Sequence, residues 1–265
     1  MNRGRFAALG EWARLDGPEG TLMVDSAVRA LRDAAAEGLA NHGGAFAAAH
    51  RTDAVVEEAR VAVGRLLGVL PQKVAFGPSM TAMTMRFAAA ARPRRVVCTR
   101  LDHDANVAPW LLHAQEVVFA DPEPGTLELP LAAIERVLEG ADWVAVTAAS
   151  NAVGTVPDLR AICALAHAAG ARAYVDAVHA APHRPLDVPA IGCDVLACSA
   201  YKWFGPHVGV LCIDDLELMA SLPVGKLRLR RAFLPTAYQP LRDLIDPRKG
   251  CAADPISSRP MDFWV

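Results

Sequence analysis

The stretch ARAYVD at residues 171–176 is an apolar run that ends on a carboxylate, and it follows a helix-like run at 158–169. The chain before it repeats this alternation. Strand-like runs lie at 95–99, 116–120, 142–147 and 171–175, and helix-like runs near 104–114, 130–138 and 158–169 separate them. Strands that alternate with helices of about ten residues predict a parallel sheet with helical crossovers, so the expected fold class is α/β.

Further elements are expected on both sides of this region. Before it, we expect helices at 26–39 and 53–68, a short strand at 74–76 and a helix that begins near Ser79. After it, the apolar runs at 194–198 and 208–212 leave no room for a helix between them. We therefore expect these two runs to pair antiparallel, at or near an edge of the sheet.

The composition excludes several classes of protein. The chain has 265 residues and a formal net charge of −2, with 53% hydrophobic and 21% charged residues. These fractions are typical of a globular chain, and the charge balance gives no reason to expect a nucleic acid or an anionic membrane as a partner. The first residues lack the apolar stretch of a signal peptide, and no apolar run reaches the ~18 residues that a bilayer crossing needs. Six cysteines without C-x-x-C spacing indicate reduced thiols in a cytoplasmic protein.

Two motifs after strand-like runs carry ionisable groups. In SAYKWFGP at 199–206, Lys202 follows an apolar run and precedes a Gly-Pro turn. It is either a surface lysine on a loop or a Schiff-base lysine whose amine is partly desolvated by aromatic neighbours. In YVDAVH at 174–179, Asp176 stands where a strand should end. It either caps the next element or pairs with the protonated pyridine nitrogen of pyridoxal phosphate (PLP).

Three weaker motifs also follow strand-like runs. FGPSMT at 76–81 places hydroxyls at a helix start, where backbone N–H groups suit a phosphate, although the same residues would make an ordinary helix cap. LDHDANVAPW at 101–110 contains His103, either a solvated loop residue or a group that stacks on a planar ring and moves protons. ASNAVGT at 149–155 contains Asn151, either a turn residue or a donor to a cofactor oxygen.

All five motifs share one position, the carboxyl end of a strand, where an open α/β sheet places its ligand. Together they predict one coherent site for PLP. A metal hydrolase or oxygenase site built from Asp176, His179 and His183 is the competing hypothesis. Pro182 and Pro185 argue against the continuous helix that this metal site needs, so no metal is expected.

With NHGG at 41–44, these motifs follow the order found in the class V aminotransferase family. From about residue 5 to about residue 228 the chain resembles that family, and within it the cysteine desulfurase-like branch. The resemblance implies the large domain of a fold type I PLP-dependent transferase, with a mostly parallel seven-stranded sheet, one antiparallel strand and helices on both faces. It also implies that residues 1–225 form the PLP-binding domain, that the substrate is a small amino acid, and that the protein is a homodimer.

The resemblance implies roles for the ionisable residues. Lys202 forms the internal aldimine with PLP and moves protons at the substrate Cα, and Asp176 pairs with the pyridine nitrogen. His103 stacks on the ring and is the second catalytic residue. His179 lies near the phenolic oxygen of the ring, and Asn151 approaches that oxygen or the substrate.

The phosphate of PLP is implied to lie at the start of the helix in the FGPSMT motif. Met80 and Thr81 bind it chiefly through backbone N–H groups, and Ser199 adds its hydroxyl. One position departs from the pattern, because Tyr201 stands where many desulfurases have a histidine.

The C-terminal part of the chain departs further. Residues 226–265 are expected to form an atypical, poorly ordered tail in place of the small C-terminal domain, which in the family carries the persulfide-forming cysteine and an arginine for the substrate carboxylate. Five of the six cysteines lie in or beside expected core elements, so Cys251 is the one thiol expected to move freely. We therefore expect a PLP enzyme of the cysteine desulfurase type, which cleaves a C–S bond, with little activity in this chain. A catalytically impaired PLP-binding protein, transamination and epimerisation are the alternatives.

Overall fold

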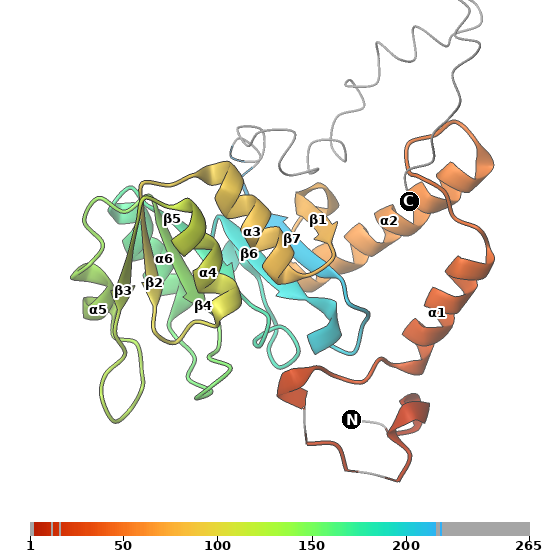
Figure 1. Ribbon diagram of the computed structural model, residues 1–265, viewed down its shortest axis with the longest axis horizontal. Helices are drawn as coiled ribbons and strands as arrows, with labels where there is room; N and C mark the ends of the chain where they lie inside the picture. The colour runs from red at the N-terminus through yellow and green to blue at the C-terminus, as the bar shows by residue number, and fades with distance from the viewer. Residues whose placement is uncertain (1–2, 12, 16, 216–217, 219–265) are drawn as a thin grey trace, which may run out of the picture.

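A seven-stranded sheet forms the centre of the computed structural model, which describes residues 3–11, 13–15, 17–215 and 218 (Figure 1). The strands are β1 (Val74–Gly77), β2 (Arg95–Thr99), β3 (Glu116–Ala120), β4 (Trp143–Thr147), β5 (Arg172–Asp176), β6 (Val195–Ser199) and β7 (Gly209–Ile213). The tail predicted at 226–265, with Cys251, lies outside the described residues.

The strands lie side by side in the order β1-β7-β6-β5-β4-β2-β3. β7 runs antiparallel to both of its neighbours, β6 and β1, and the other four pairs among the described strands are parallel. The chain moves outward from β2 to β3 and then returns to place β4, β5 and β6 on the other side of β2. Such a reversal opens a crevice at the carboxyl ends of the strands, which is where open α/β sheets bind their ligands.

Helices cover both faces of the sheet. They are α2 (Ala47–Leu67), α3 (Met80–Ala91), α4 (Asp104–His113), α5 (Leu131–Glu135), α6 (Leu159–Ala168) and α7 (Val188–Ile191). Helix α1 (Asp25–Ala36) has no buried residue and lies apart from the sheet in Figure 1. Figure 1 shows α3 and α4 in front of the sheet and α6 behind it. Because side chains alternate along a strand, Tyr174 of β5 packs with the α3–α4 layer and Val175 packs on the opposite face. Within the described part of the chain, no helix combines the length and the apolar character that a bilayer crossing requires.

An aromatic cluster fills the core between the sheet and the α3–α4 layer. The Phe87 ring lies 5.2 Å from the Trp143 ring and 5.4 Å from the Tyr174 ring, and the Trp110 ring lies 5.3 Å from the Tyr174 ring. The Tyr174 hydroxyl pairs with the Thr84 hydroxyl at 2.7 Å, so this buried polar group is satisfied. Aromatic edge-to-face contacts of this kind add stabilisation to the burial of apolar area.

The sequence predicted the strands closely and the helix ends less well. All seven strands lie where strand-like runs occur, and the antiparallel pairing of the last two runs beside an edge strand is confirmed. Helix α2 begins at Ala47 rather than near 53, because alanines favour a helix without contributing to apolar periodicity. Helix α1 ends before Gly38, whose φ of 65° is left-handed, and α5 ends at Glu135.

The aromatic cluster predicts a measurable contribution to stability. Phe87 is fully buried, and Phe87→Ala is expected to lower the free energy of unfolding by about 3–5 kcal/mol through lost burial and a new cavity. Phe46→Ala is the matched control, because Phe46 is 55% exposed, and its cost is expected to stay below about 1 kcal/mol. Urea unfolding followed by circular dichroism measures both, and equal losses in the two variants would contradict this assignment of the core.

Candidate active site

The carboxyl ends of β5 and β6 and the start of α3 surround a small cavity of about 80 Å³. Its lining comes from four segments that are far apart in the sequence: Ser79, Met80, Thr81, His103, Ala105, Asp176, Val178, His179, Ser199, Tyr201 and Lys202. Seven of the eight site residues expected from the sequence belong to this lining, and Asn151 does not. The topology therefore brings together residues that are far apart in the sequence, as the hydrogen bond from the Met80 N–H to Ser199 Oγ shows, with a separation of 119 positions.

Asp176 is the last residue of β5 and its side chain lines the cavity. The Val178 N–H donates to its Oδ1 at 2.9 Å, which makes the turn after the strand. The residue is 4% exposed, and burial raises the pKa of its carboxyl to about 7, although the Val178 N–H and the nearby Lys202 lower it. A buried carboxyl with this pKa is poised to accept a cationic group in the cavity.

Lys202 follows β6 on a short 3-10 turn, Ala200–Lys202, and is 8% exposed. The interpretation of Lys202 as a surface lysine is therefore wrong, because the turn directs it into the cavity wall. Burial lowers the pKa of its amine, while Glu19 and Asp176 act in the opposite direction. Its Nζ lies 5.1 Å from the centroid of the Tyr201 ring, which gives the ammonium form an aromatic neighbour.

The start of α3 faces the same cavity. The Ser79 side chain caps the helix by accepting the Ala82 N–H at 3.1 Å, and the Met80 N–H donates to Ser199 Oγ at 3.0 Å. Gly209 of β7 permits this close approach, since a Cβ there would overlap the backbone of Ser79. The Ser199 hydroxyl hydrogen and the positive end of the helix dipole both point to an anion at this corner of the cavity.

His103 and Asn151 are less closely associated with this cavity. His103 is exposed and caps α4, with its Nδ1 accepting the Ala105 N–H at 3.0 Å. Because Nδ1 accepts, the proton of the neutral ring lies on Nε2. Asn151 is exposed and lines a neighbouring cavity of about 330 Å³, which shares His103 with the first. Among the predicted residues, Asn151 is the one that the described structure leaves outside the small cavity.

His179 lies after β5 and is half-buried. Burial and the nearby Lys202 lower the pKa of its imidazole to about 4, so the ring is neutral near neutral pH and offers one donor and one acceptor. In residues 3–215, apart from the two undescribed positions, no three His, Cys, Asp or Glu side chains are grouped closely enough to hold a metal ion. The competing metal site of Asp176, His179 and His183 is thus not assembled.

Asp102 is a buried carboxyl beside the site that no sequence motif indicated. The Thr99 N–H and hydroxyl donate to its Oδ2 at 2.9 and 2.6 Å, and Asn106 Nδ2 donates to its Oδ1 at 3.0 Å. Burial raises the pKa of Asp102 to about 6 despite these bonds, and its charge raises the pKa of Asp176. The sequence signal for this network is the hydroxyl of Thr99, three residues before Asp102, and the amide of Asn106, four residues after it.

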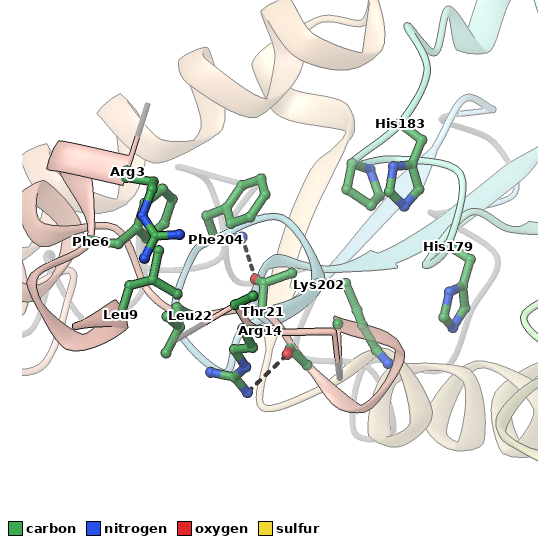
Figure 2. Close-up of a pocket in the computed structure, with 14 residues that line it drawn as sticks. Arg3, Phe6, Leu9, Arg14, Thr21, Leu22, His179, His183, Lys202 and Phe204 are labelled. Carbon is green, nitrogen blue, oxygen red and sulfur yellow. Dashed lines mark hydrogen bonds between the residues drawn. The ribbon is translucent and has the colours of Figure 1, made fainter. Parts of the chain in front are cut away.

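The N-terminal segment is a second feature without a sequence signal. It walls a larger cavity of about 510 Å³ that Lys202 and His179 also line. Figure 2 shows Arg14, Thr21 and Lys202 around this cavity. No local motif marks the segment. Its Thr21 hydroxyl donates to the Tyr201 carbonyl, which lies 180 positions away in the chain.

Known proteins resemble this chain over most of its length. Residues 15–234 match the profile of the aminotransferase class-V family. The uncharacterised protein MT3887 of Mycobacterium tuberculosis (strain CDC 1551 / Oshkosh) is 35% identical over 230 residues, which are 83% of this chain and 58% of that protein. A cysteine desulfurase of Yersinia pestis (strain Pestoides F) is 36% identical over 121 residues, which are 44% of this chain and 30% of the enzyme.

Solved structures show the same fold. The cysteine desulfurase CsdA from Escherichia coli matches with a TM-score of 0.71 at 28% identity, over 83% of this chain and 58% of that one. The apo cysteine desulfurase from Thermococcus onnurineus NA1 matches with a TM-score of 0.75 at 24% identity, over 83% of this chain and 57% of that one. This chain therefore spans a little over half the length of these relatives.

The buried carboxyl predicts a pH-dependent stability in the cofactor-free protein. Because folding raises the pKa of Asp176 from 3.8 to about 7, the protonated form stabilises the fold at low pH, and this stabilisation is lost as the pH rises from about 4 to about 7. Asp176→Asn keeps an acceptor for the Val178 N–H but never ionises. Its free energy of unfolding relative to wild type is expected to increase by up to about 4 kcal/mol between pH 4 and pH 8, measured by urea unfolding.

The control for this prediction is Asp158→Asn. Asp158 is exposed and caps α6 by accepting the Ala161 N–H at 3.1 Å, a bond that an asparagine oxygen also makes. This variant therefore reports the effect of an Asp→Asn change at a hydrogen-bonded carboxyl that is not buried. A difference between Asp176→Asn and wild type that stays constant across the pH range would refute the effect of burial on Asp176.

Proposed function

This chain belongs to the class-V aminotransferase family, and we propose that it is a PLP-dependent enzyme acting on a small amino acid. The observation that carries the proposal is the pair of Lys202 and Asp176, both buried and both lining one cavity at the carboxyl ends of neighbouring parallel strands. A buried lysine and a buried carboxylate with opposed pKa shifts are typical of a catalytic site rather than of a structural ion pair on the surface.

The side chains around the cavity fit the chemical groups of PLP. The Asp176 carboxyl suits the protonated pyridine nitrogen, and the start of α3 with the Ser199 hydroxyl suits the phosphate. The Lys202 amine suits the aldehyde, because its lowered pKa increases the share of the neutral, nucleophilic form. When bound, PLP supplies an electron sink for negative charge at the substrate Cα.

The chain's own residues would then orient the cofactor and move protons. Lys202 is the base within reach of the cofactor site, and we assign to it the proton at the substrate Cα. His103 offers a flat ring with its proton on Nε2, which suits stacking on the cofactor. The neutral His179 is assigned to the phenolic oxygen of the ring, to which it can donate one hydrogen bond.

Within this class, we propose a reaction of the cysteine desulfurase type. The support is the similarity to the Yersinia pestis and Escherichia coli desulfurases, together with the shared fold. By the same family membership we propose that the chain forms a homodimer and is cytoplasmic.

A specific observation favours the alternative of a PLP protein with impaired or different chemistry. A desulfurase needs an accessible thiolate as its nucleophile. Five cysteines of the described residues are free thiols and all are buried: Cys98, Cys163, Cys193, Cys198 and Cys212. Burial raises the pKa of each of them, which disfavours the thiolate. Transamination and epimerisation need no such thiol and are therefore the competing reactions.

Chemical trapping tests the assignment of Lys202. Borohydride reduction of the PLP-loaded protein, followed by peptide mapping, is expected to place the cofactor on Lys202, because this amine is buried beside the proposed ring site. Lys73 is the internal control. Its Nζ donates a hydrogen bond to Asp214 Oδ1 at 2.6 Å, and the residue lies just before β1, outside the lining of the cavity. Label on Lys73, or the same labelling in Lys202→Ala, would overturn the assignment.

Sulfide release tests the finer reaction. With cysteine and a reductant, we expect this chain to release little sulfide, because the five described thiols are buried. Cys251→Ala and Lys202→Ala are compared with wild type. Robust release that Cys251→Ala abolishes would instead identify a mobile thiol at that position, and release that survives Lys202→Ala would exclude the proposed chemistry.

A further inference from the structure

The Thr21 hydroxyl bonds to the backbone on both sides of Lys202. It donates to the Tyr201 carbonyl at 2.8 Å, and it accepts the Phe204 N–H at 2.7 Å (Figure 2). The backbone around Thr21 adds two more bonds, from the Thr21 N–H to the Tyr201 carbonyl and from the Val24 N–H to the Phe204 carbonyl, each at 3.0 Å. One side chain therefore joins the residue before Lys202 to the residue two places after it.

The turn after Lys202 depends on this external bond. Phe204 has a φ of 70°, a left-handed conformation that is unfavourable for a residue with a side chain. The Trp203 and Gly205 N–H groups both donate to the Ala200 carbonyl at 2.9 Å, within the turn itself. The Phe204 N–H instead donates to Thr21. The turn thus provides bonds for the neighbours of Phe204, and Thr21 provides the bond that fixes the strained residue.

The same segment contacts the ring beside the Lys202 amine. Gly20 approaches Tyr201 so closely that a Cβ at residue 20 would lie 3.2 Å from the Tyr201 ring. This ring stacks on His207, with the two ring centroids 4.7 Å apart, and the Lys202 Nζ lies 5.1 Å from the centroid of the Tyr201 ring. Contacts with residues 20–24 therefore locate both the backbone that flanks Lys202 and the ring beside its amine.

The sheet determines the position of Lys202 less directly than that of its partners in the small cavity. Asp176 and Ser199 are the last residues of β5 and β6, so strand pairing fixes them. Lys202 stands three residues beyond β6, at the end of a 3-10 turn, and a flexible four-carbon stem separates its amine from the backbone. Precise placement matters, because a misplacement of about 1 Å can slow a reaction about a hundredfold.

We propose that Thr21 is a positioning residue, whose hydroxyl holds the turn so that the Lys202 amine lies in the small cavity. This inference rests on the proposed function, since positioning matters only if Lys202 reacts. The competing interpretation is that the four bonds only fasten the N-terminal segment to the rest of the chain. The two differ in what the loss of the hydroxyl does to the reaction of Lys202.

Three variants separate these interpretations. Thr21→Val removes both hydroxyl bonds and keeps the shape of the side chain, whereas Thr21→Ser keeps the hydroxyl. Thr52→Val is the matched control, because the Thr52 hydroxyl donates to the Ala40 carbonyl at 2.7 Å and accepts the Ala40 N–H at 3.1 Å. Thr52 therefore also bonds a carbonyl and an N–H of a separate segment, and it lines neither cavity that Lys202 lines.

Hydrogen exchange of the cofactor-free protein tests the bonds themselves. In Thr21→Val the Phe204 N–H loses its acceptor, and its exchange, followed by NMR, should become about tenfold faster. Thr21→Ser and Thr52→Val should leave this exchange rate as it is in wild type. An unchanged rate in Thr21→Val would show that the hydroxyl does not hold the turn, and would overturn the proposal.

The rate at which PLP becomes attached to Lys202 tests the positioning. The neutral Nζ bonds to the aldehyde carbon, and both amine protons leave with the aldehyde oxygen as water. Borohydride, added at successive times, then delivers hydride to that carbon while the nitrogen takes up a proton, and mass spectrometry quantifies the label on Lys202. The dependence of the rate on PLP concentration gives a limiting rate, which reports the placement of the amine, and a half-saturating concentration, which reports the binding of PLP.

Thr21→Val should lower the limiting rate about tenfold, because the amine spends less time within reach of the aldehyde. The half-saturating concentration should change less than twofold, since the Met80 N–H and the Ser199 hydroxyl at the start of α3 are untouched. Thr21→Ser should recover most of the limiting rate. Thr52→Val should behave as wild type in both quantities.

Two results would overturn the positioning role while Lys202 remains labelled in wild type. One is an unchanged limiting rate in Thr21→Val despite faster exchange of the Phe204 N–H, which would make Thr21 a fastening residue only. The other is an equal loss of limiting rate and of PLP binding, which would indicate general damage to the site. If wild type takes no label on Lys202, the proposed function itself fails and the role of Thr21 fails with it, whatever the exchange rates show.

Discussion

The burial of Asp176 and Lys202 against the same cavity constrains the rest of the structure. Each group loses hydration, and burial favours the neutral form of each. The pKa of the carboxyl therefore rises and the pKa of the amine falls. Their mutual attraction offsets part of this cost but does not remove it. The pair persists because the apolar residues of β5 and β6 are wholly buried, which leaves the strand ends no alternative position. The stability of the core thus offsets the cost of holding two ionisable groups away from water.

The sheet determines where Lys202 lies, and the turn after β6 determines the backbone conformation around it. Phe204, two residues later, has a φ of 70°, a left-handed conformation that is strained for a residue with a side chain. Its N–H and carbonyl are both bonded to the N-terminal segment, through Thr21 and Val24, and its ring meets Phe6 at 5.5 Å. The strained turn is therefore held from outside by a segment that forms no part of the sheet. The sheet thus sets the position of Lys202, and the N-terminal segment holds the conformation of the turn that follows it.

This division explains what could be predicted from the sequence. The α/β class and the strands followed from apolar runs, because strands buried on both faces, such as β2 and β4, are continuous apolar runs, whereas the seven-stranded sheet was implied by the family resemblance. The small cavity followed as well, since residues after successive parallel strands meet at one edge. Asn151 lies after β4 as expected, yet it lines the neighbouring cavity and not the small one. The turn after a strand decides which cavity a residue faces, and apolar runs do not predict its conformation. The contacts of Thr21 could not be predicted, because a single hydroxyl that bonds backbone groups some 180 residues away leaves no local pattern in the sequence.

In the proposed function, the residues that would hold the cofactor do not by themselves select the reaction. In the proposed function, proton movement at the substrate Cα would need Lys202, Asp176 and a planar electron sink, and transamination, epimerisation and C–S cleavage would all share this requirement. What separates these reactions is the next group that reaches the substrate. C–S cleavage of the desulfurase type requires a thiolate, and the described thiols lie inside the sheet and its helices, where burial keeps them protonated. A thiol in the core cannot be exposed without unfolding the strand that carries it, since Cys98, Cys198 and Cys212 are themselves strand residues. Selection among the reactions must therefore come from segments that approach the cavity from outside the sheet, as residues 17–24 do.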